Sequence, residues 1–240
     1  MVMGRPLFFA SAYSQAGYAT GILAESNQGR PTKIEGNPDH PLSSDGNGRG
    51  VSDLWMQASV LGLWDPDRSQ YVAHNGEMSE WDIFAAAYDA RLKKRKGSGF
   101  RILSGAQTSP TLVDQLQKLL KLAPAAQWHV WEPVSQDNVF EGARLSFGRP
   151  LQPVYDFTKA QCIVGLDADS LGEDPAHLRY SRDFIKGRYT PGKEAGAVTA
   201  MNRFYAFEST PAITGAKADH RFPVKASAIE AVSREIASQL

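Results

Sequence analysis

The chain has 240 residues, with 26 Lys and Arg against 26 Asp and Glu, so its net charge is zero. Proteins that bind nucleic acids or anionic membranes normally carry a basic excess, so we expect no nucleic-acid partner. The single cysteine, Cys162, excludes an intramolecular disulfide and any zinc or iron–sulfur site with four thiolates from this chain, and no apolar run approaches the roughly 18–20 residues of a membrane span.

Residues 1–75 are rich in Gly, Pro, Asn and Asp, which predicts a small β-rich and loop-rich segment. Two extended stretches on either side of a turn signal, 18–26 and 32–35, predict a β-hairpin. Residues 43–50 form a glycine-rich stretch without the Lys-Ser/Thr of a phosphate-binding P-loop, so a plain flexible loop is the favoured interpretation. Residues 51–63 predict a short helix.

From about residue 76 to 240 the apolar pattern alternates between helix and strand. The expected strands are 100–105, 127–131, 162–166 and 203–207. The expected helices are 79–96, 109–120, 137–147, 174–185 and 227–236. Strands that alternate with helices imply crossover connections. The predicted fold is therefore α/β, with a Rossmann-like, mostly parallel sheet flanked by helices and preceded by the small hairpin segment.

Several polar residues are expected to begin these helices. Ser79 is placed to cap the first one, Asp174-Pro175 resembles a cap followed by proline at the first helical position, and Ser227 with Glu230 resembles a capping box. The inner stripe of the helix after residue 174 is predicted to be Leu178, Ser181, Phe184 and Ile185.

Candidate binding residues lie at the carboxyl ends of the expected strands, where parallel sheets bind ligands. They are Ser104 and Gly105 after the first strand, Asp167 and Asp169 after the third, and Glu208 after the fourth. No G-x-G-x-x-G motif accompanies them, so the signal for a nucleotide is weak. Acidic residues at strand ends also cap helices and loops, and this structural role is the favoured interpretation.

The remaining polar residues predict neither a catalytic group nor a metal ligand. The five histidines, His40, His74, His129, His177 and His220, are far apart and lack the spacing of a metal-binding motif. His40 is expected to fix a turn by a hydrogen bond. Cys162 opens an apolar strand, so a buried and inert thiol is expected.

Three blocks of sequence resemble segments of the molybdopterin oxidoreductase (dimethyl sulfoxide reductase-like) family. They are residues 29–41 (GRPTKIEGNPDHP), 65–68 (DPDR) followed by 79–82 (SEWD), and 218–223 (ADHRFP). Within that family, residues 201–203, 208–211 and 214–220 are similar to the large iron–sulfur subunit of bacterial alternative complex III, a quinol:electron-acceptor oxidoreductase. The resemblance implies that the chain is the first part of a longer protein whose cluster-binding cysteines lie further on.

The chain departs from the catalytic members of that family at the cluster. Those members carry four cysteines in the stretches that match residues 9–18 and 42–51, and neither stretch holds a cysteine here. Hydroxyl and amide groups do not replace four thiolates around iron. The resemblance therefore implies that residues 1–75 correspond to an iron–sulfur domain without its cluster.

The chain departs from the same pattern at the pterin cofactor. Ser135 lies in the loop from which a side chain often ligates molybdenum, Glu208 replaces an aspartate that holds a ribose, and Lys225 lies near the position of a guanine-reading carboxylate. The resemblance implies that molybdopterin has been lost. What remains is a vestigial cofactor pocket: Ser104, Gly105, Asp167, Glu208 and Asp219.

The resemblance implies a non-catalytic scaffold domain in a membrane-bound, quinol-oxidising complex. Its partners would include cytochrome c and membrane quinol-binding subunits. It would lie in the periplasm or on the outer face of the bacterial cytoplasmic membrane, as a peripheral protein. Two alternatives stay open: an active domain that binds molybdopterin guanine dinucleotide, and a small nucleotide-binding Rossmann-like module.

Overall fold

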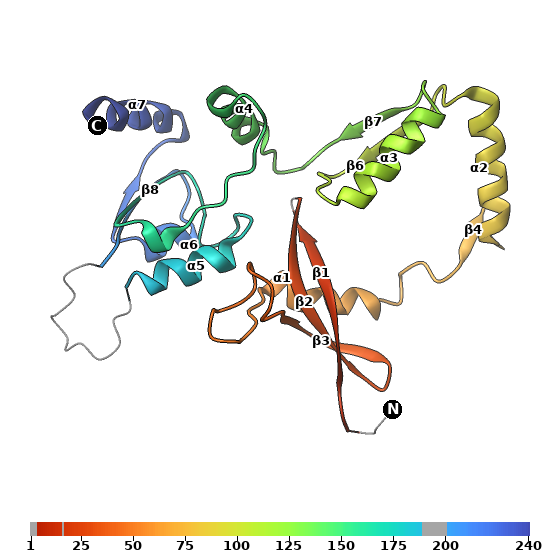
Figure 1. Ribbon diagram of the computed structural model, residues 1–240, viewed down its shortest axis with the longest axis horizontal. Helices are drawn as coiled ribbons and strands as arrows, with labels where there is room; N and C mark the ends of the chain where they lie inside the picture. The colour runs from red at the N-terminus through yellow and green to blue at the C-terminus, as the bar shows by residue number, and fades with distance from the viewer. Residues whose placement is uncertain (1–3, 16, 189–200) are drawn as a thin grey trace. The chain divides into compact units, whose positions relative to one another are not determined.

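The computed structural model describes residues 4–15, 17–188 and 201–240, which form a mixed α/β fold (Figure 1). These residues divide into two compact units. The first unit holds residues up to Tyr13, Thr20–Gln57 and Pro153–Leu240, and the second holds Ser14–Ala19 and Ala58–Gln152. The expected fold class is confirmed, because a small hairpin sheet precedes parallel sheets flanked by helices. The expected domains, 1–75 and 76–240, stay a prediction.

The first sheet has the strand order β1 (Leu7–Gln15), β2 (Tyr18–Asn27) and β3 (Arg30–Gly36). The expected hairpin is confirmed as β2 and β3, which pair antiparallel around Gln28 and Gly29. Both turn residues have positive φ, 52° and 82°, which suits the right-handed twist of the strands. The sequence did not reveal β1, because none of its side chains is buried and its apolar residues do not alternate with polar ones.

Short elements follow in chain order. The expected helix at 51–63 is a single α-helical turn followed by a 3-10 helix, α1 (Leu54–Ala58) and η1 (Ser59–Leu63). A second hairpin, not predicted, pairs β4 (Val72–His74) with β5 (Glu77–Ser79). Ser79 therefore ends a strand, and the expected Ser79 cap is wrong, since Glu80 is the residue before α2 (Trp81–Arg95).

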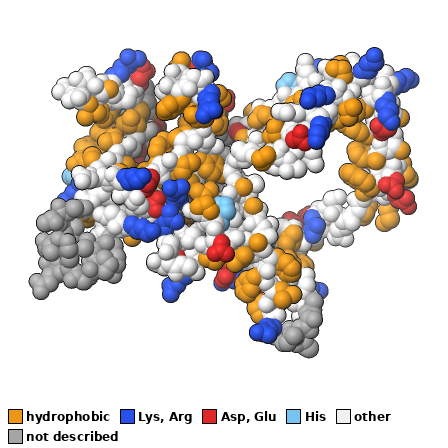
Figure 2. Space-filling model, in the orientation of Figure 1, with side chains coloured by type: hydrophobic (Ala, Val, Ile, Leu, Met, Phe, Trp, Pro, Cys, Tyr) orange, Lys and Arg blue, Asp and Glu red, His pale blue; other side chains and the backbone are white. Residues whose placement is uncertain are grey.

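Helix α2 presents the expected apolar stripe, although no side chain of the helix is buried. Trp81, Phe84 and Tyr88 form a row of ring contacts with centroid distances of 5.3 and 5.9 Å, and Tyr88 meets the ring of Phe100 edge-on. Figure 2 shows hydrophobic side chains along this helix. Periodicity therefore located the stripe, but neighbouring elements of the second unit leave it largely uncovered.

The second unit continues as one parallel βαβ pair. Its elements are β6 (Arg101–Ser104), α3 (Pro110–Leu122), β7 (Gln127–Val130) and α4 (Asp137–Phe147). Strands β6 and β7 are parallel, with Ile102 opposite Trp128. Helix α3 starts after Ser109 as expected, and the Ser109 side chain caps it, because it accepts from the Leu112 backbone N–H at 3.3 Å.

The first unit contains the other parallel sheet. Its elements are η2 (Phe157–Lys159), β8 (Cys162–Leu166), α5 (His177–Lys186), β9 (Arg203–Glu208), α6 (Ile213–Lys217), β10 (His220–Pro223), η3 (Ala226–Ala228) and α7 (Ile229–Gln239). The strand order is β10–β9–β8, all parallel. The expected parallel strands thus lie in two sheets among the described residues, because alternation of strand and helix does not determine which strands pair.

Two helix starts in the first unit differ from expectation. Helix α5 begins at His177 rather than at Pro175, after Ala176 in the left-handed conformation with φ of 68°. Ser227 lies within η3, and no side chain hydrogen bond caps α7, so the expected capping box is wrong. In both cases a local irregular turn takes the place of the side-chain cap.

The core of the first unit lies between β9 and α5. Phe204 is fully buried, and the rings of Phe184 and Phe157 meet it edge-on at centroid distances of 5.7 and 6.3 Å. Phe184 is on the expected inner stripe of α5, whereas Ile185 is exposed and Tyr180 is buried in its place. The spacing of residues 180 and 184 defines the buried face of α5. None of the described helices is long and apolar enough to cross a lipid bilayer.

Candidate functional site

At the carboxyl ends of β8 and β9, the Asp167 carboxylate accepts hydrogen bonds from Ser209 in the loop after β9. Asp167 has a positive φ of 51°, and its side chain accepts from the backbone N–H of Ser209 at 2.9 Å and from its hydroxyl at 3.0 Å. Asp167 is exposed, but its carboxylate joins the loops that follow the two strands. The expected structural role of this acid is confirmed.

Asp169 has the same kind of role at the start of α6. Its side chain accepts from the Thr214 backbone N–H at 2.9 Å and from the Thr214 hydroxyl at 2.8 Å. The fully buried Thr214 oxygen accepts in turn from the Leu171 backbone N–H. Asp169 thereby caps α6 from a distant part of the sequence. Burial, and then the charge of Asp169, raise the pKa of the neighbouring Asp174 carboxyl.

Glu208 is buried at the end of β9 and is bound by Arg221 of β10. The Arg221 Nε donates to Glu208 Oε1 at 2.5 Å. Gly215 of α6 makes room for this carboxylate, since a Cβ there would lie 2.0 Å from Glu208 Oε1. A carboxylate held between a guanidinium and a helix backbone stabilises the fold. Its Oε1 atom already accepts a hydrogen bond from Arg221.

Asp219 lies at the opposite end of the same sheet. It precedes β10, and its side chain binds the Arg188 guanidinium with both oxygens and accepts from the Phe204 backbone N–H at 2.8 Å. Since β9 and β10 are parallel, Phe204 marks the amino end of the strands, whereas Glu208 marks the carboxyl end. The structure therefore does not bring Asp219 together with Asp167 and Glu208.

Asp219 predicts a pH dependence of stability. Hydrogen bonds from Arg188 hold the pKa of the Asp219 carboxyl below its usual value. The stabilisation is therefore complete above the ordinary aspartate pKa of about 3.9 and is lost as the pH falls through the lower, folded-state pKa. We expect Asp219→Asn to lower stability at pH 7 and to flatten the acid side of the stability curve, measured by urea unfolding from pH 2 to 7. An unchanged acid limb would contradict this.

Ser104 and Gly105 lie in the second unit, after β6. The Ser104 hydroxyl oxygen accepts from the Trp128 indole N–H at 2.9 Å. Glu132, which follows β7, accepts from the Ala106 backbone N–H, and a Cβ at Gly105 would lie 2.8 Å from Glu132 Oε1. The five residues expected to form one vestigial pocket are thus distributed over both units, two in the second and three in the first.

A hollow of about 270 Å³ lies at the carboxyl ends of β6 and β7, and Ala106, which follows Ser104 and Gly105, is part of its lining. Aromatic and aliphatic side chains form part of its wall, and Ser135 and Asp137 add polar groups. The lining residues are Ala106, Val130, Trp131, Glu132, Val134, Ser135, Gln136, Asp137 and Phe140. Sequence reasoning noted Ser135 and the residues after the strand, but it did not reveal the aromatic wall, which depends on how α4 follows β7.

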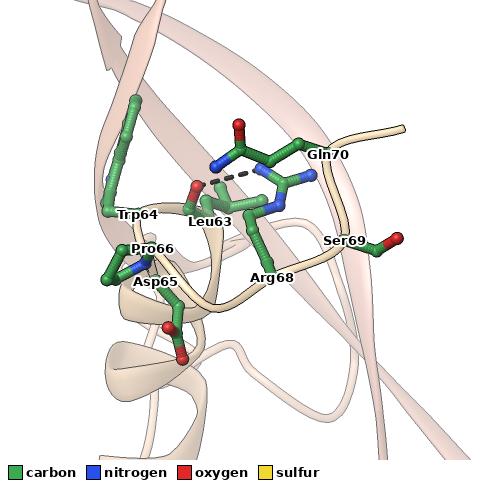
Figure 3. Close-up of a pocket in the computed structure, with 7 residues that line it drawn as sticks. All are labelled: Leu63, Trp64, Asp65, Pro66, Arg68, Ser69 and Gln70. Carbon is green, nitrogen blue, oxygen red and sulfur yellow. Dashed lines mark hydrogen bonds between the residues drawn. The ribbon is translucent and has the colours of Figure 1, made fainter. Parts of the chain in front are cut away.

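A second hollow, of about 420 Å³, is formed by the loop after η1 (Figure 3). Its lining is local, from Leu63 to Gln70, and includes the segment 65–68. The Arg68 guanidinium donates to the Leu63 carbonyl at 2.9 Å and so closes the loop on itself.

Residues 42–51, one of the two stretches in which the resemblance predicted missing cluster cysteines, form a hydrogen-bonded turn. Ser43 is fully buried, and its hydroxyl lies 2.7 Å from the Gly21 carbonyl and 2.9 Å from the Asn37 carbonyl. The Val51 backbone N–H donates to the Ser43 carbonyl at 2.6 Å. A buried hydroxyl bound to carbonyls is not a ligand for iron, so residues 42–51 do not fit an iron–sulfur cluster.

His40 and Cys162 give one confirmed expectation and one wrong one. The Leu42 backbone N–H donates to His40 Nδ1 at 3.3 Å, and Gly21 leaves room for the imidazole, so His40 does fix its turn. Cys162 is exposed, and the expected buried thiol is wrong. It begins β8, where Ile163 points into the core and Cys162 to the opposite face. Among described residues, no cluster of His, Cys, Asp and Glu could hold a metal ion.

Comparisons with known proteins add nothing to the description of the site. No protein-family model matches the chain, and no curated protein matches its sequence. The resemblance of residues 29–41 to molybdopterin oxidoreductases therefore stays a prediction.

Proposed function

We propose that this chain is a non-catalytic scaffold domain of a respiratory, quinol-oxidising iron–sulfur subunit. The single observation that carries the proposal is the turn at residues 42–51, where the buried Ser43 hydroxyl is satisfied by two carbonyls. The sequence of the preceding turn, 29–41, is similar to molybdopterin oxidoreductases. In this proposal, the Ser43 hydroxyl holds residues 42–51 in place of a thiolate bound to iron. This supports a domain that has kept the architecture of that family without its cluster.

The acidic residues that follow β8 and end β9 give a second line of support. Asp167 and Asp169 bind Ser209 and Thr214, and Glu208 binds Arg221. Carboxylates that already accept hydrogen bonds from protein donors stabilise the fold. In this proposal iron–sulfur clusters belong to the remainder of the parent subunit, and this domain contributes docking surface and support for that part.

The proposed partners are the other subunits of a membrane-bound complex, including cytochrome c and membrane quinol-binding subunits. The proposed location is the periplasm or the outer face of the bacterial cytoplasmic membrane, where the domain would be peripheral. The long exposed stripe on α2, with Trp81 at 66% and Phe84 at 51% exposure, supports a role in docking, because aromatic side chains are enriched in protein interfaces.

Two measurements test this function. We expect the purified chain to hold neither iron nor molybdenum in stoichiometric amount by elemental analysis. We expect a tag on the chain, introduced into its source organism, to isolate a membrane complex that contains haem c and oxidises menaquinol. Stoichiometric metal in the purified chain would overturn the scaffold role. Isolation of the chain without such a complex would overturn the assignment to respiration.

A small-ligand function is the second candidate, and the 270 Å³ hollow favours it. The hollow lies where parallel α/β sheets bind ligands, and Trp131 and Phe140 could contact a planar ring. Titration calorimetry with guanosine nucleotides and with a reduced pterin tests it. Heat that disappears in Phe140→Ala and persists in Phe147→Ala, a control on the same helix, would support a nucleotide- or pterin-binding domain. No heat at millimolar ligand would exclude it.

A further inference from the structure

Helix α2 carries charges of opposite sign at its two ends. Glu80 directly precedes its first residue, whereas Lys93, Lys94 and Arg95 form its last turn. Of these three cations, only Lys93 has an ionic partner in the described part of the chain, which is Asp89 at 2.5 Å. Figure 2 shows basic side chains gathered at one end of this helix. Each sign suits the dipole of the helix itself, so the charges alone do not indicate a partner.

The apolar stripe of α2 is the feature that the helix dipole does not explain. Trp81, Phe84 and Tyr88 follow one another at intervals of three and four residues, which places them on one face, and the same spacing continues to Arg91 and Arg95. Trp81 is 66% exposed and Phe84 51%. An isolated helix of this length is marginal in water unless its apolar face is packed. The stripe therefore requires a covering element.

A second copy of α2 complements the first when the two helices run antiparallel. A two-fold axis near Tyr88, the middle of the helix, places Trp81 of one copy against Arg95 of the other, where a guanidinium over an indole ring is favourable. Glu80 and Lys94 lie on the same side of the stripe, because they are close to four full turns apart. The same axis therefore brings Glu80 of one copy beside Lys94 of the other. A parallel pair would instead place the two basic ends together.

We propose that this chain pairs with a second copy of itself through α2, antiparallel, with Trp81 against Arg95 and Glu80 beside Lys94. The pairing concerns the occupant of the stripe and does not rest on the respiratory assignment. A helix of 15 residues is about 22 Å long, so the interface is at the small end of specific protein interfaces. We expect a micromolar rather than a nanomolar dimer, which salt weakens because exposed charges are screened.

Analytical ultracentrifugation of the full chain tests the pairing. We expect the average mass to rise from monomer toward dimer between about 10 μM and 1 mM, where a weak complex becomes populated. Trp81→Ala should weaken association roughly tenfold or more, as is common for a tryptophan in an interface. Trp131→Ala removes a similarly exposed tryptophan of the same unit and should change nothing. A chain that stays monomeric, or equal effects of the two variants, would overturn the pairing and leave the stripe to a different protein.

Exchange of the two charges is the decisive experiment. In Glu80→Lys alone and in Lys94→Glu alone, like charges meet across the two-fold axis, so each variant should self-associate roughly tenfold more weakly. Mixed in equal amounts, the two variants can pair with each other through opposite charges, and the dimer should return. A variant that had merely lost its helix would not recover on mixing.

Lys121→Glu is the matched control for this exchange. It makes the same change of charge as Lys94→Glu, at an exposed position in the last turn of α3. Self-association should therefore stay at the level of the unmodified chain. A mixture of Glu80→Lys and Lys94→Glu that remains as monomeric as its two components would overturn the antiparallel pairing. Equal weakening by Lys121→Glu would overturn it as well, because the effect would then follow net charge rather than position.

Discussion

Phe204→Ala should lower the stability of the first unit by about 3–5 kcal/mol, the usual cost of removing a buried phenylalanine. Phe204 is fully buried on β9, and the rings of Phe157 and Phe184 contact it from two other elements. Its removal leaves a cavity at the point where the sheet meets α5. Because β9 ends at Glu208 and pairs with β8 and β10, which adjoin Asp167 and Asp219, the change should disturb the candidate site as well.

The measurement must distinguish the two units, since a chain with two units need not unfold in one step. Hydrogen exchange under increasing urea reports each unit through its own peptides. We expect Phe204→Ala to weaken peptides of β8 and β9 and to leave those of β6 and β7 unchanged. Phe222→Ala is the matched control, because this side chain is 41% exposed and should cost about 1 kcal/mol. Equal losses from the two variants would contradict the assigned core.

Gly50→Ala should be the most damaging small substitution in the turn at residues 42–51. The backbones of Gly36 and Gly50 approach so closely that a Cβ on Gly50 would lie 1.6 Å from the Gly36 carbonyl oxygen. Backbone atoms cannot rotate away as a flexible side chain can, so the turn must open. We expect a loss of about 3 kcal/mol or more, at the upper end of the range for overpacking.

Gly48→Ala is the control for this prediction. Gly48 lies in the same loop with φ of 80°, but nothing lies within 4 Å of a Cβ placed there. It should therefore cost only the left-handed conformation, about 1–2 kcal/mol. Thermal unfolding of the two variants separates close approach from backbone conformation. If Gly50→Ala were no worse than Gly48→Ala, the close packing of this turn would be contradicted.

Local sequence patterns predicted the elements well where neighbours in the chain decide the structure. The hairpin followed from the turn signal at residues 27–30, and the start of α3 followed from Ser109 before Pro110. The failures have local causes too. Ser79 pairs with Val72 in the β4–β5 hairpin, and Ser227 lies in the 3-10 helix η3. Neither residue is therefore at the N-cap position of an α-helix.

The candidate site was predictable only in part. Strand ends indicated Asp167, Glu208 and Ser104, but sequence position could not show that Arg221 would bind Glu208 or that Thr214 would bind Asp169. Those partners come from other strands and helices. Asp219 was grouped with the strand ends from its resemblance, and the parallel register of β9 and β10 places it at the other end of the sheet.

The sequence by itself determined the α/β class, the single thiol and the absence of cysteines at residues 42–51, because composition and periodicity are properties of the chain alone. Only the tertiary structure decided that the parallel strands form two sheets, that Ser43 is buried against two carbonyls, and that Arg221 binds Glu208. The physical reason is that hydrogen bonds and ion pairs between distant residues depend on the packing of the backbone, which local pattern does not specify.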